Sequence, residues 1–153
     1  MTEASPVLFL FRVCGAWFGT DVHVIRQVTQ LRQPSLIPGV PGHILGLVPH
    51  GQDVLPVLDL GRFLQLQSAG ASSAPESDRE VLARLLVVTI GSLDVAIPVD
   101  QTGGLLPVAL DARREVSVMS GDLLRRFLKG EFDSPRGVAG LLDLPALLEA
   151  ARV

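Results

Sequence analysis

Apolar residues in this chain recur in short runs and alternations that are typical of β-strands. Two glycines mark turns between neighbouring runs, Gly15 in the first half of the chain and Gly91 in the second. The segment 24–28 is also apolar, but its periodicity does not distinguish helix from strand. The pattern therefore predicts strands at residues 7–13, 17–22, 54–58, 85–90 and 95–99. Strands this short and closely spaced favour small β-barrels over a βαβ sheet.

Leucine and phenylalanine recur at helical spacing in three short segments. In two of them an aspartate, Asp59 or Asp143, precedes the first apolar residue, and Asp59 can cap the first helical turn. The apolar positions are Leu60, Phe63 and Leu64 in the first segment, Leu123, Leu124, Phe127 and Leu128 in the second, and Leu144, Leu147 and Leu148 in the third. We expect three short helices, with the last two apolar residues of the first and third helix buried in a shared core.

The two halves of the chain resemble each other. Residues 58–64 match residues 142–148, and each segment closes its half after a β-rich run. Between the halves, residues 67–80 are small and polar, which is typical of a flexible linker. We predict two similar β-lobes, each ending in a short helix; the alternative is a chance similarity between leucine-rich segments. In residue numbers, the prediction is one domain at 7–149 with subdomains at about 7–66 and 81–149, and tails at 1–6 and 150–153.

Composition restricts what this domain can do. Of the 153 residues, 48% are hydrophobic and 19% are charged, which excludes a disordered chain. The formal net charge of −3 provides no basic surface for nucleic acid or for an anionic membrane. No apolar stretch is long enough to cross a membrane, the first residues lack the features of a signal peptide, and the single cysteine cannot form an internal disulfide. We therefore expect a cytoplasmic protein that does not insert into the membrane.

The sequence contains no recognisable catalytic or metal-binding set. Its three histidines, His23, His43 and His50, have no cysteine or carboxylate at the spacing of a zinc or iron site. No histidine or basic residue adjoins Cys14, so we interpret it as a small buried hydrophobe and not as a reactive thiol. Nucleophile elbows, phosphate-binding loops and dinucleotide motifs are also missing. The sequence therefore predicts no catalytic residues, no metal and no cofactor, and a protein that is not an enzyme.

Six segments of the chain carry motifs that recur in one known family. In the first half they are Phe-Gly-Thr-Asp-Val-His-Val-Ile-Arg-Gln-Val at 18–28, Ile-Pro-Gly-Val-Pro-Gly-His-Ile-Leu-Gly at 37–46 and Val-Leu-Pro-Val-Leu-Asp-Leu at 54–60. In the second half they are Ile-Pro-Val-Asp at 97–100, Phe-Leu-Lys-Gly at 127–130 and Leu-Leu-Asp-Leu at 141–144. In this order they resemble the motifs of CheW-like domains, the family of a bacterial chemotaxis adaptor, and the resemblance spans residues 7–149.

The resemblance implies a mainly β fold of two SH3-like, five-stranded β-barrel subdomains side by side, with short helices. It also implies a non-catalytic adaptor that links the signalling domain of a methyl-accepting chemoreceptor, at its cytoplasmic tip, to the regulatory domain of a CheA-type histidine kinase. By the same resemblance, the receptor-facing groove lies around Ile25, Val28 and Gly46. The residues leave an alternative open, a β-barrel module that binds another protein or a small ligand and shares only the fold.

Three positions depart from the family's pattern in regions associated with receptor and kinase coupling. The family's Asn-Leu-Arg-Gly reads Pro-His-Gly-Gln at 49–52, so Gly51 and Gln52 replace its arginine and glycine. Gln27 stands where a glutamate is common. An arginine supplies several directed donors and a fixed charge, which the neighbouring His50 replaces only in part. We therefore predict a rewritten contact surface and weaker kinase coupling; the alternative is neutral drift at the rim of an interface.

Overall fold

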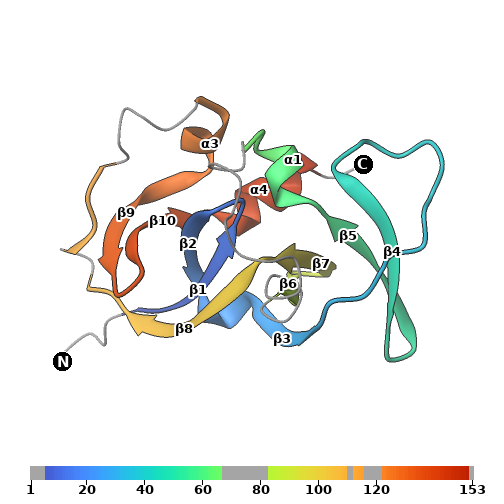
Figure 1. The fold of residues 1–153 in the computed structure, drawn as a ribbon, viewed down its shortest axis with the longest axis horizontal. Helices are drawn as coiled ribbons and strands as arrows, with labels where there is room; N and C mark the ends of the chain where they lie inside the picture. The colour runs from blue at the N-terminus through green and yellow to red at the C-terminus, as the bar shows by residue number, and fades with distance from the viewer. Residues whose placement is uncertain (1–5, 67–82, 110–111, 116–121, 152–153) are drawn as a thin grey trace.

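The computed structural model describes residues 6–66, 83–109, 112–115 and 122–151, and the predicted linker at 67–80 lies outside this part. The strands form two five-stranded sheets side by side (Figure 1), so the predicted mainly β fold is confirmed. Sheet A has the order β8-β1-β2-β10-β9, with bounds Gln101–Pro107, Val7–Val13, Ala16–Asp21, Gly137–Leu142 and Leu128–Ser134. Sheet B has the order β3-β6-β7-β5-β4, with bounds Ile25–Gln30, Arg84–Ile90, Leu93–Val99, Asp53–Leu58 and Ile44–His50.

Each sheet takes strands from both halves of the chain. The first half contributes β1 and β2 to sheet A and β3, β4 and β5 to sheet B. The second half contributes β6 and β7 to sheet B and β8, β9 and β10 to sheet A. The prediction of one lobe at about 7–66 and another at 81–149 is therefore wrong. Periodicity shows where a strand lies but does not show which strand it pairs with, so this exchange is invisible in the pattern.

The predicted internal repeat is present in the topology. The two sheets have the same strand order when strands whose numbers differ by five are taken as equivalent. In sheet B the order is β3-β6-β7-β5-β4, and the equivalent strands of sheet A follow as β8-β1-β2-β10-β9. Both copies also end alike, because the backbone N–H groups of Asp59 and Asp143 donate to the carbonyl oxygens of His43 and Phe127, each at 2.7 Å. The two halves of the chain are therefore copies of one strand arrangement that have interlocked.

The expected helices are present among the described residues as α1 (Leu60–Phe63), α3 (Asp122–Arg126) and α4 (Leu144–Ala151), and a 3₁₀ turn, η1, covers Val22–Val24. The carboxylate of Asp59 accepts a hydrogen bond from the backbone N–H of Arg62 at 3.1 Å, and that of Asp143 accepts one from Ala146 at 3.2 Å. The predicted cap at Asp59 is confirmed, and Asp143 caps α4 in the same way. α3 is shorter than expected because Leu128 begins β9. No helix in the described ranges is long and apolar enough to span a membrane.

The strands that the hydrophobic pattern missed or left undecided lie mainly at sheet edges. β8 and β9 form the edges of sheet A, and β3 and β4 form those of sheet B. An edge strand needs fewer apolar side chains, because solvent covers part of it. β9 accordingly carries the exposed residues Lys129 and Asp133, and β8 contains the pair Gly103-Gly104. Central strands such as β1 and β6 are buried over most of their length and match their predicted positions closely.

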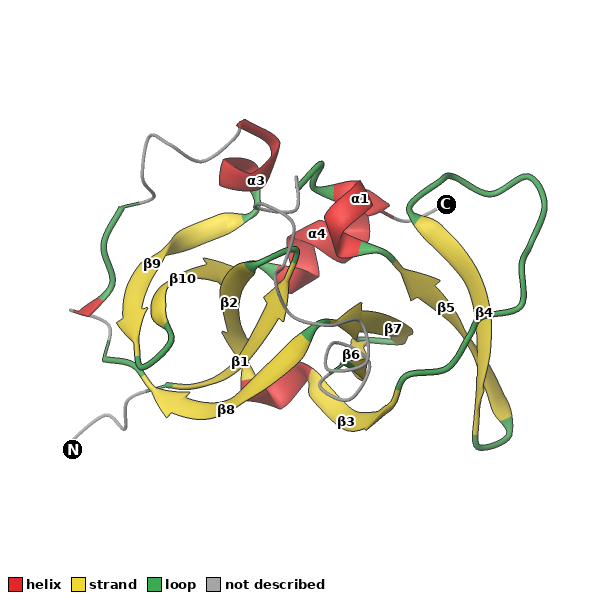
Figure 2. Cartoon of the chain, in the orientation of Figure 1, coloured by secondary structure: helices red, strands yellow, loops and turns green. Residues whose placement is uncertain are grey.

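α1 and α4 lie between the two sheets (Figure 2). The main core packs around them. It collects apolar side chains from both sheets and from both helices, among them Phe11, Phe18, Leu60, Leu86, Ile97 and Leu144. Leu64, Leu147 and Leu148 are at most 2% exposed, as predicted. Phe63 is only half-buried, because it lies at the margin of this core, with its ring 5.7 Å from that of Phe127. Each sheet carries a smaller apolar cluster on its other face.

Candidate functional site

A groove of about 370 Å³ lies in sheet B, between its two edge strands β3 and β4. We call it the sheet B groove. Its floor is apolar and consists of Val48, Leu55, Leu85 and Val87. Its rim is largely polar and consists of Gln27, Thr29, Arg32, Pro49, His50 and Gly51. A hollow with an apolar floor and a few polar groups at its rim has the general form of a binding site.

The register of β3 explains which of its side chains face this groove. Residues that pair directly in neighbouring antiparallel strands point to the same face of the sheet. Gln27 and Thr29 pair with Val87 and Leu85 of β6, which belong to the small apolar cluster of sheet B. Val28, between them, pairs with a residue of the main core and so points to the opposite face. β3 therefore presents different side chains to the groove and to the side of the main core.

The three residues predicted to face a receptor lie on the two edge strands of sheet B, Ile25 and Val28 on β3 and Gly46 on β4. Ile25 is half-buried against the main core, and Val28 is 39% exposed on the same strand. Gly46 is buried in β4, at the other edge of sheet B. Its φ is +149°, and a Cβ atom there would clash with the carbonyl oxygen of Ser35. Gly46 therefore has a backbone role, since it allows Ser35 to pair with Leu47 of β4 through hydrogen bonds of 2.8 and 2.9 Å.

The positions that depart from the family's pattern do converge. Gln27 on β3 and Gly51 at the tip of the β4–β5 hairpin both line the sheet B groove. Gly51 has a φ of +61°, which favours glycine at the first central position of this two-residue turn, and exposed Gln52 follows it. The family's Arg-Gly order places glycine at the second central position instead. The departures therefore change one groove wall and the turn that bounds it.

Apart from Leu55, which belongs to the motif at 54–60, no local motif marks the other residues of the groove. Thr29 lies on β3, Arg32 follows that strand, Leu55 lies on β5, and Leu85 and Val87 lie on β6. They meet only because β3 pairs with β6 while β5 joins the same sheet from the other side. Knowledge of strand pairing is the one signal that could have identified them from the sequence.

The three histidines lie in separate places. Nε2 of His43 is 3.2 Å from the carbonyl oxygen of Ala151, and the imidazole packs edge-on against Phe63, so His43 holds the end of α4. His50 lines the sheet B groove, and His23 is exposed beside Asp21. Within the described ranges, no group of three or more histidine, cysteine or carboxylate side chains could hold a metal ion.

Cys14 occupies the β1–β2 turn with a φ of +51° and is half-buried. Burial raises the pKa of its thiol, and the carboxylates of Asp100 and Asp59 raise that pKa further. A thiol that stays protonated at neutral pH is a weak nucleophile. The surroundings of Cys14 therefore agree with its interpretation as a small hydrophobe; its sulfur packs beside the main core.

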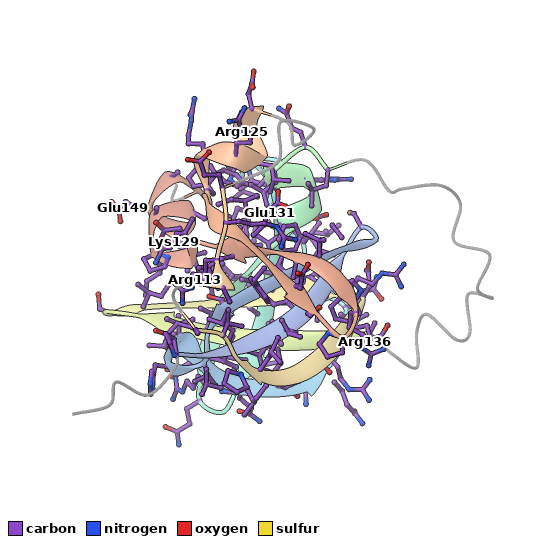
Figure 3. All side chains as sticks on the ribbon, turned by 90° about the vertical axis from the view of Figure 1, so that its left-hand side faces the viewer. Arg113, Arg125, Lys129, Glu131, Arg136 and Glu149 are labelled. Atoms are coloured by element: carbon purple, nitrogen blue, oxygen red, sulfur yellow. The ribbon has the colours of Figure 1, made fainter. Side chains whose placement is uncertain are left out.

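A surface of mixed charge covers sheet A around α3 and β9, where Figure 3 labels basic and acidic side chains on the same side of the molecule. Arg114 and Asp133 form a bidentate ion pair there, with N–O distances of 2.8 and 3.1 Å. This hydrogen bonding raises the pKa of Arg114 and lowers the pKa of Asp133. At the β9–β10 turn, the guanidinium of Arg136 lies over the ring of Trp17, 5.3 Å from its centroid. Because both positive and negative groups lie on this face, it lacks the uniform field that attracts nucleic acid.

Comparison with known proteins gives a consistent result along the chain. The family model of the CheW-like domain matches residues 7–152. The chain is 25% identical over 147 residues to the "Probable chemotaxis protein CheW" of Rhizobium etli, an alignment covering 96% of this chain and 90% of that protein. It is 29% identical over 146 residues to protein FrzA of Myxococcus xanthus, with 94% of this chain and 86% of FrzA covered.

A solved structure has the same fold. It is the crystal structure of the scaffolding protein CheW from Thermoanaerobacter tengcongensis, which matches with a TM-score of 0.77. The match covers 96% of this chain and 90% of that one, at 18% sequence identity. Similarity at this level of identity concerns the arrangement of the strands, and it agrees with the two interlocked sheets described above.

Proposed function

We propose, from the premise that this chain belongs to the CheW-like domain family, that it is a non-catalytic adaptor in a chemotaxis-type signal transduction system. The observation that carries the proposal is the family match over residues 7–152, a range that includes both sheets and both copies of the internal repeat. The names of the relatives support it, since CheW of Rhizobium etli is called a chemotaxis protein and the fold neighbour a scaffolding protein. An adaptor works through its surfaces, so its partners and their sites define its function.

The partners that we propose are the signalling domain of a methyl-accepting chemoreceptor and the regulatory domain of a CheA-type histidine kinase, both reached in the cytoplasm. Exposed apolar side chains support partner surfaces on sheet B and its 31–43 connection. Four large hydrophobic residues are exposed there, Val28, Leu31, Leu36 and Val54. Apolar groups in water gain free energy when a partner covers them, so their concentration in one region favours an interface.

For the receptor, we propose contact with the face of β3 that carries Ile25 and Val28, while Gly46 shapes the other edge of the sheet. A receptor tip is a helical hairpin, and a helix commonly binds by burying one apolar side against another apolar surface. Val28 is 39% exposed and points to the side of sheet B that faces away from the groove. A charge at Val28 would be desolvated without a partner in such an interface, so Val28→Asp is expected to weaken binding by about 2 kcal/mol.

For the kinase, we propose weaker coupling than in family members with the usual arginine. Gly51 and Gln27 leave neutral groups where the family pattern has charged ones, and both line the sheet B groove. An interface arginine is often a hot spot, because its guanidinium forms several directed hydrogen bonds. Gly51→Arg combined with Gln52→Gly should therefore increase kinase binding. The second change is needed because an arginine at a φ of +61° is strained, whereas glycine at the next position permits the family's turn.

Pull-down experiments with the two partner domains, measured separately, test this proposal. The wild-type chain is expected to capture the receptor domain, and Val28→Asp is expected to lose most of that capture. Val138→Asp is the matched control, since Val138 is 55% exposed on sheet A. Equal loss in both variants would place the receptor face elsewhere. Capture of neither partner domain by the folded wild-type chain would favour the alternative, a binding module that shares only the fold.

A further inference from the structure

The internal repeat allows each side chain of one sheet to be compared with its counterpart in the other. β9 corresponds to β4 and pairs in the same register, so Phe132 is the counterpart of Val48. β8 corresponds to β3, so Leu106 is the counterpart of Thr29. The β1–β8 pair of sheet A and the β3–β6 pair of sheet B each contain one register shift, and the two shifts lie at equivalent points. In sheet A the shift follows Leu10 of β1, and in sheet B it follows Ile25 of β3.

Sheet A fills the space that sheet B leaves open. The side chain of Phe132 is 0% exposed, and its ring lies so close to Gly19 that a Cβ there would be 2.7 Å from it. Sheet B has a valine in place of this phenylalanine and a threonine in place of Leu106, and the sheet B groove lies at those two positions. The groove therefore lies at the position that a phenylalanine side chain fills in the other copy of the repeat, with Ala96 in place of Gly19 taking up part of that space.

The rim of the groove adds a charge preference. Arg32 is exposed at the rim, and it makes no hydrogen bond or ion pair within the described part of the chain. Among the described residues, no acidic side chain lines the groove, although Asp53 lies across the β4–β5 hairpin from His50. A carboxylate brought to this rim would gain a charge-assisted hydrogen bond with the guanidinium.

The backbone of the groove walls adds a shape preference. β3 and β4 are the edge strands of sheet B, so in the described part of the chain each has one side without a neighbouring strand, apart from the pairing of Leu47 with Ser35. An extended peptide can add to such an edge through main-chain hydrogen bonds while its alternate side chains enter a pocket. A helix cannot form these main-chain bonds, because its own N–H and C=O groups are already paired.

We infer that the sheet B groove binds an extended segment of a partner protein, which inserts one phenylalanine-sized apolar side chain and places a carboxylate beside Arg32. The inference goes beyond the adaptor function, because it assigns a class of binding segment to a site that the proposed receptor face does not use. Val28 points to the opposite face of β3, so the two contacts are compatible in one molecule.

A peptide titration tests the inference. The probe is the acetylated and amidated peptide Thr-Asp-Val-Phe-Val-Asp-Thr, added to the ¹⁵N-labelled full chain at up to about 1 mM while amide shifts are recorded by NMR. Saturable shifts are expected at Gln27, Thr29 and Gly51. Replacing the phenylalanine of the peptide by alanine should weaken binding at least about tenfold, and replacing both aspartates by lysine should also weaken it.

Variants of the protein separate a specific groove from general stickiness. Val48→Phe copies the residue of sheet A into sheet B and should abolish peptide binding. It is made together with Ala96→Gly, because Ala96 stands where sheet A has Gly19 and its Cβ would meet the new ring. Val138→Phe, which adds the same ring to an exposed position of sheet A, should leave binding unchanged. If Val48→Phe fails to fold, Thr29→Leu, which copies Leu106, fills the groove from the other wall.

Three outcomes would overturn the inference. The first is equal binding of the phenylalanine and alanine peptides, and the second is full binding by a folded Val48→Phe or Thr29→Leu variant. The third is an absence of peptide binding together with self-association of the wild-type chain that Val48→Phe removes, which would make a second copy the occupant. Receptor and kinase capture are separate measurements, so a failure of the groove inference is distinguishable from a failure of the adaptor proposal.

Discussion

Sheet A and sheet B share one strand order but use their interiors differently. In sheet A, Phe132 fills the interior and Gly19 provides the room for its ring. In sheet B, Val48 and Ala96 occupy the corresponding positions, and a groove of about 370 Å³ remains open at the edge. The comparison shows that topology determines where the interior of a sheet lies, whereas side-chain volume determines whether that interior is closed or accessible.

The outer surfaces of the two sheets also differ, because sheet B again leaves more apolar surface open to a partner than sheet A does. Sheet A carries the Arg114–Asp133 ion pair and the Arg136–Trp17 contact, which involve its own residues. Sheet B and the 31–43 connection carry more of the exposed large hydrophobic residues, with Leu36 at 85% exposure as the extreme. Because unpartnered apolar surface favours association, this difference indicates that sheet B is the main interaction side and sheet A the more self-contained one.

The strongest test of this comparison removes the side chain that closes sheet A. Phe132→Ala should lower the free energy of unfolding by about 3–5 kcal/mol, because it leaves a cavity in a packed cluster. Val48→Ala, at the corresponding position beside an open groove, should cost only about 1–2 kcal/mol. Urea unfolding followed by circular dichroism measures both. Equal costs would contradict the view that only sheet A is closed by its own residues.

A second test concerns the glycines next to the register shift in each copy. Gly46→Ala should destabilise the protein by about 3 kcal/mol, since its Cβ would meet the backbone oxygen of Ser35 at a φ of +149°. Gly130→Ala should cost less, about 1–2 kcal/mol, because its Cβ would lie 2.9 Å from the oxygen of Arg114. Thermal unfolding measures the difference. The reverse order would mean that the 31–36 segment yields more easily than the residues around Arg114.

The smallest expected effect concerns the ion pair between Arg114 and Asp133 of sheet A. Sheet B has no equivalent of this pair, because Pro49 is the counterpart of Asp133. Folding lowers the pKa of Asp133, so the pair stabilises the protein above the unfolded carboxyl pKa of about 3.9. This contribution is lost as the pH falls through the lowered folded-state pKa. Asp133→Asn should therefore melt slightly below the wild type at pH 7 and no differently once the pH is well below that range. A difference that persists in acid would show that the pair acts through packing and not through charge.

Several features of this protein follow from the sequence by itself. The central strands, the helix caps at Asp59 and Asp143, and the repeated segments that follow them are local properties, and the structure contains each. The six ordered motifs also indicate the family, which the match over residues 7–152 establishes. Such features are readable because hydrophobic alternation and capping depend on residues within a few positions of one another.

Tertiary structure alone decided the rest. Strand pairing interlocks the two halves, so that β6 and β7 complete the sheet begun by β3, and no periodicity encodes that choice. The same pairing brings Gln27 and Gly51 to one groove and leaves Gly46 to a backbone contact. The physical reason is that a strand's partner is selected by the burial of side chains distant in sequence. A groove is open at Val48, whereas the equivalent space in sheet A is filled by Phe132. Which of the two results depends on the volumes of all the side chains that surround each position.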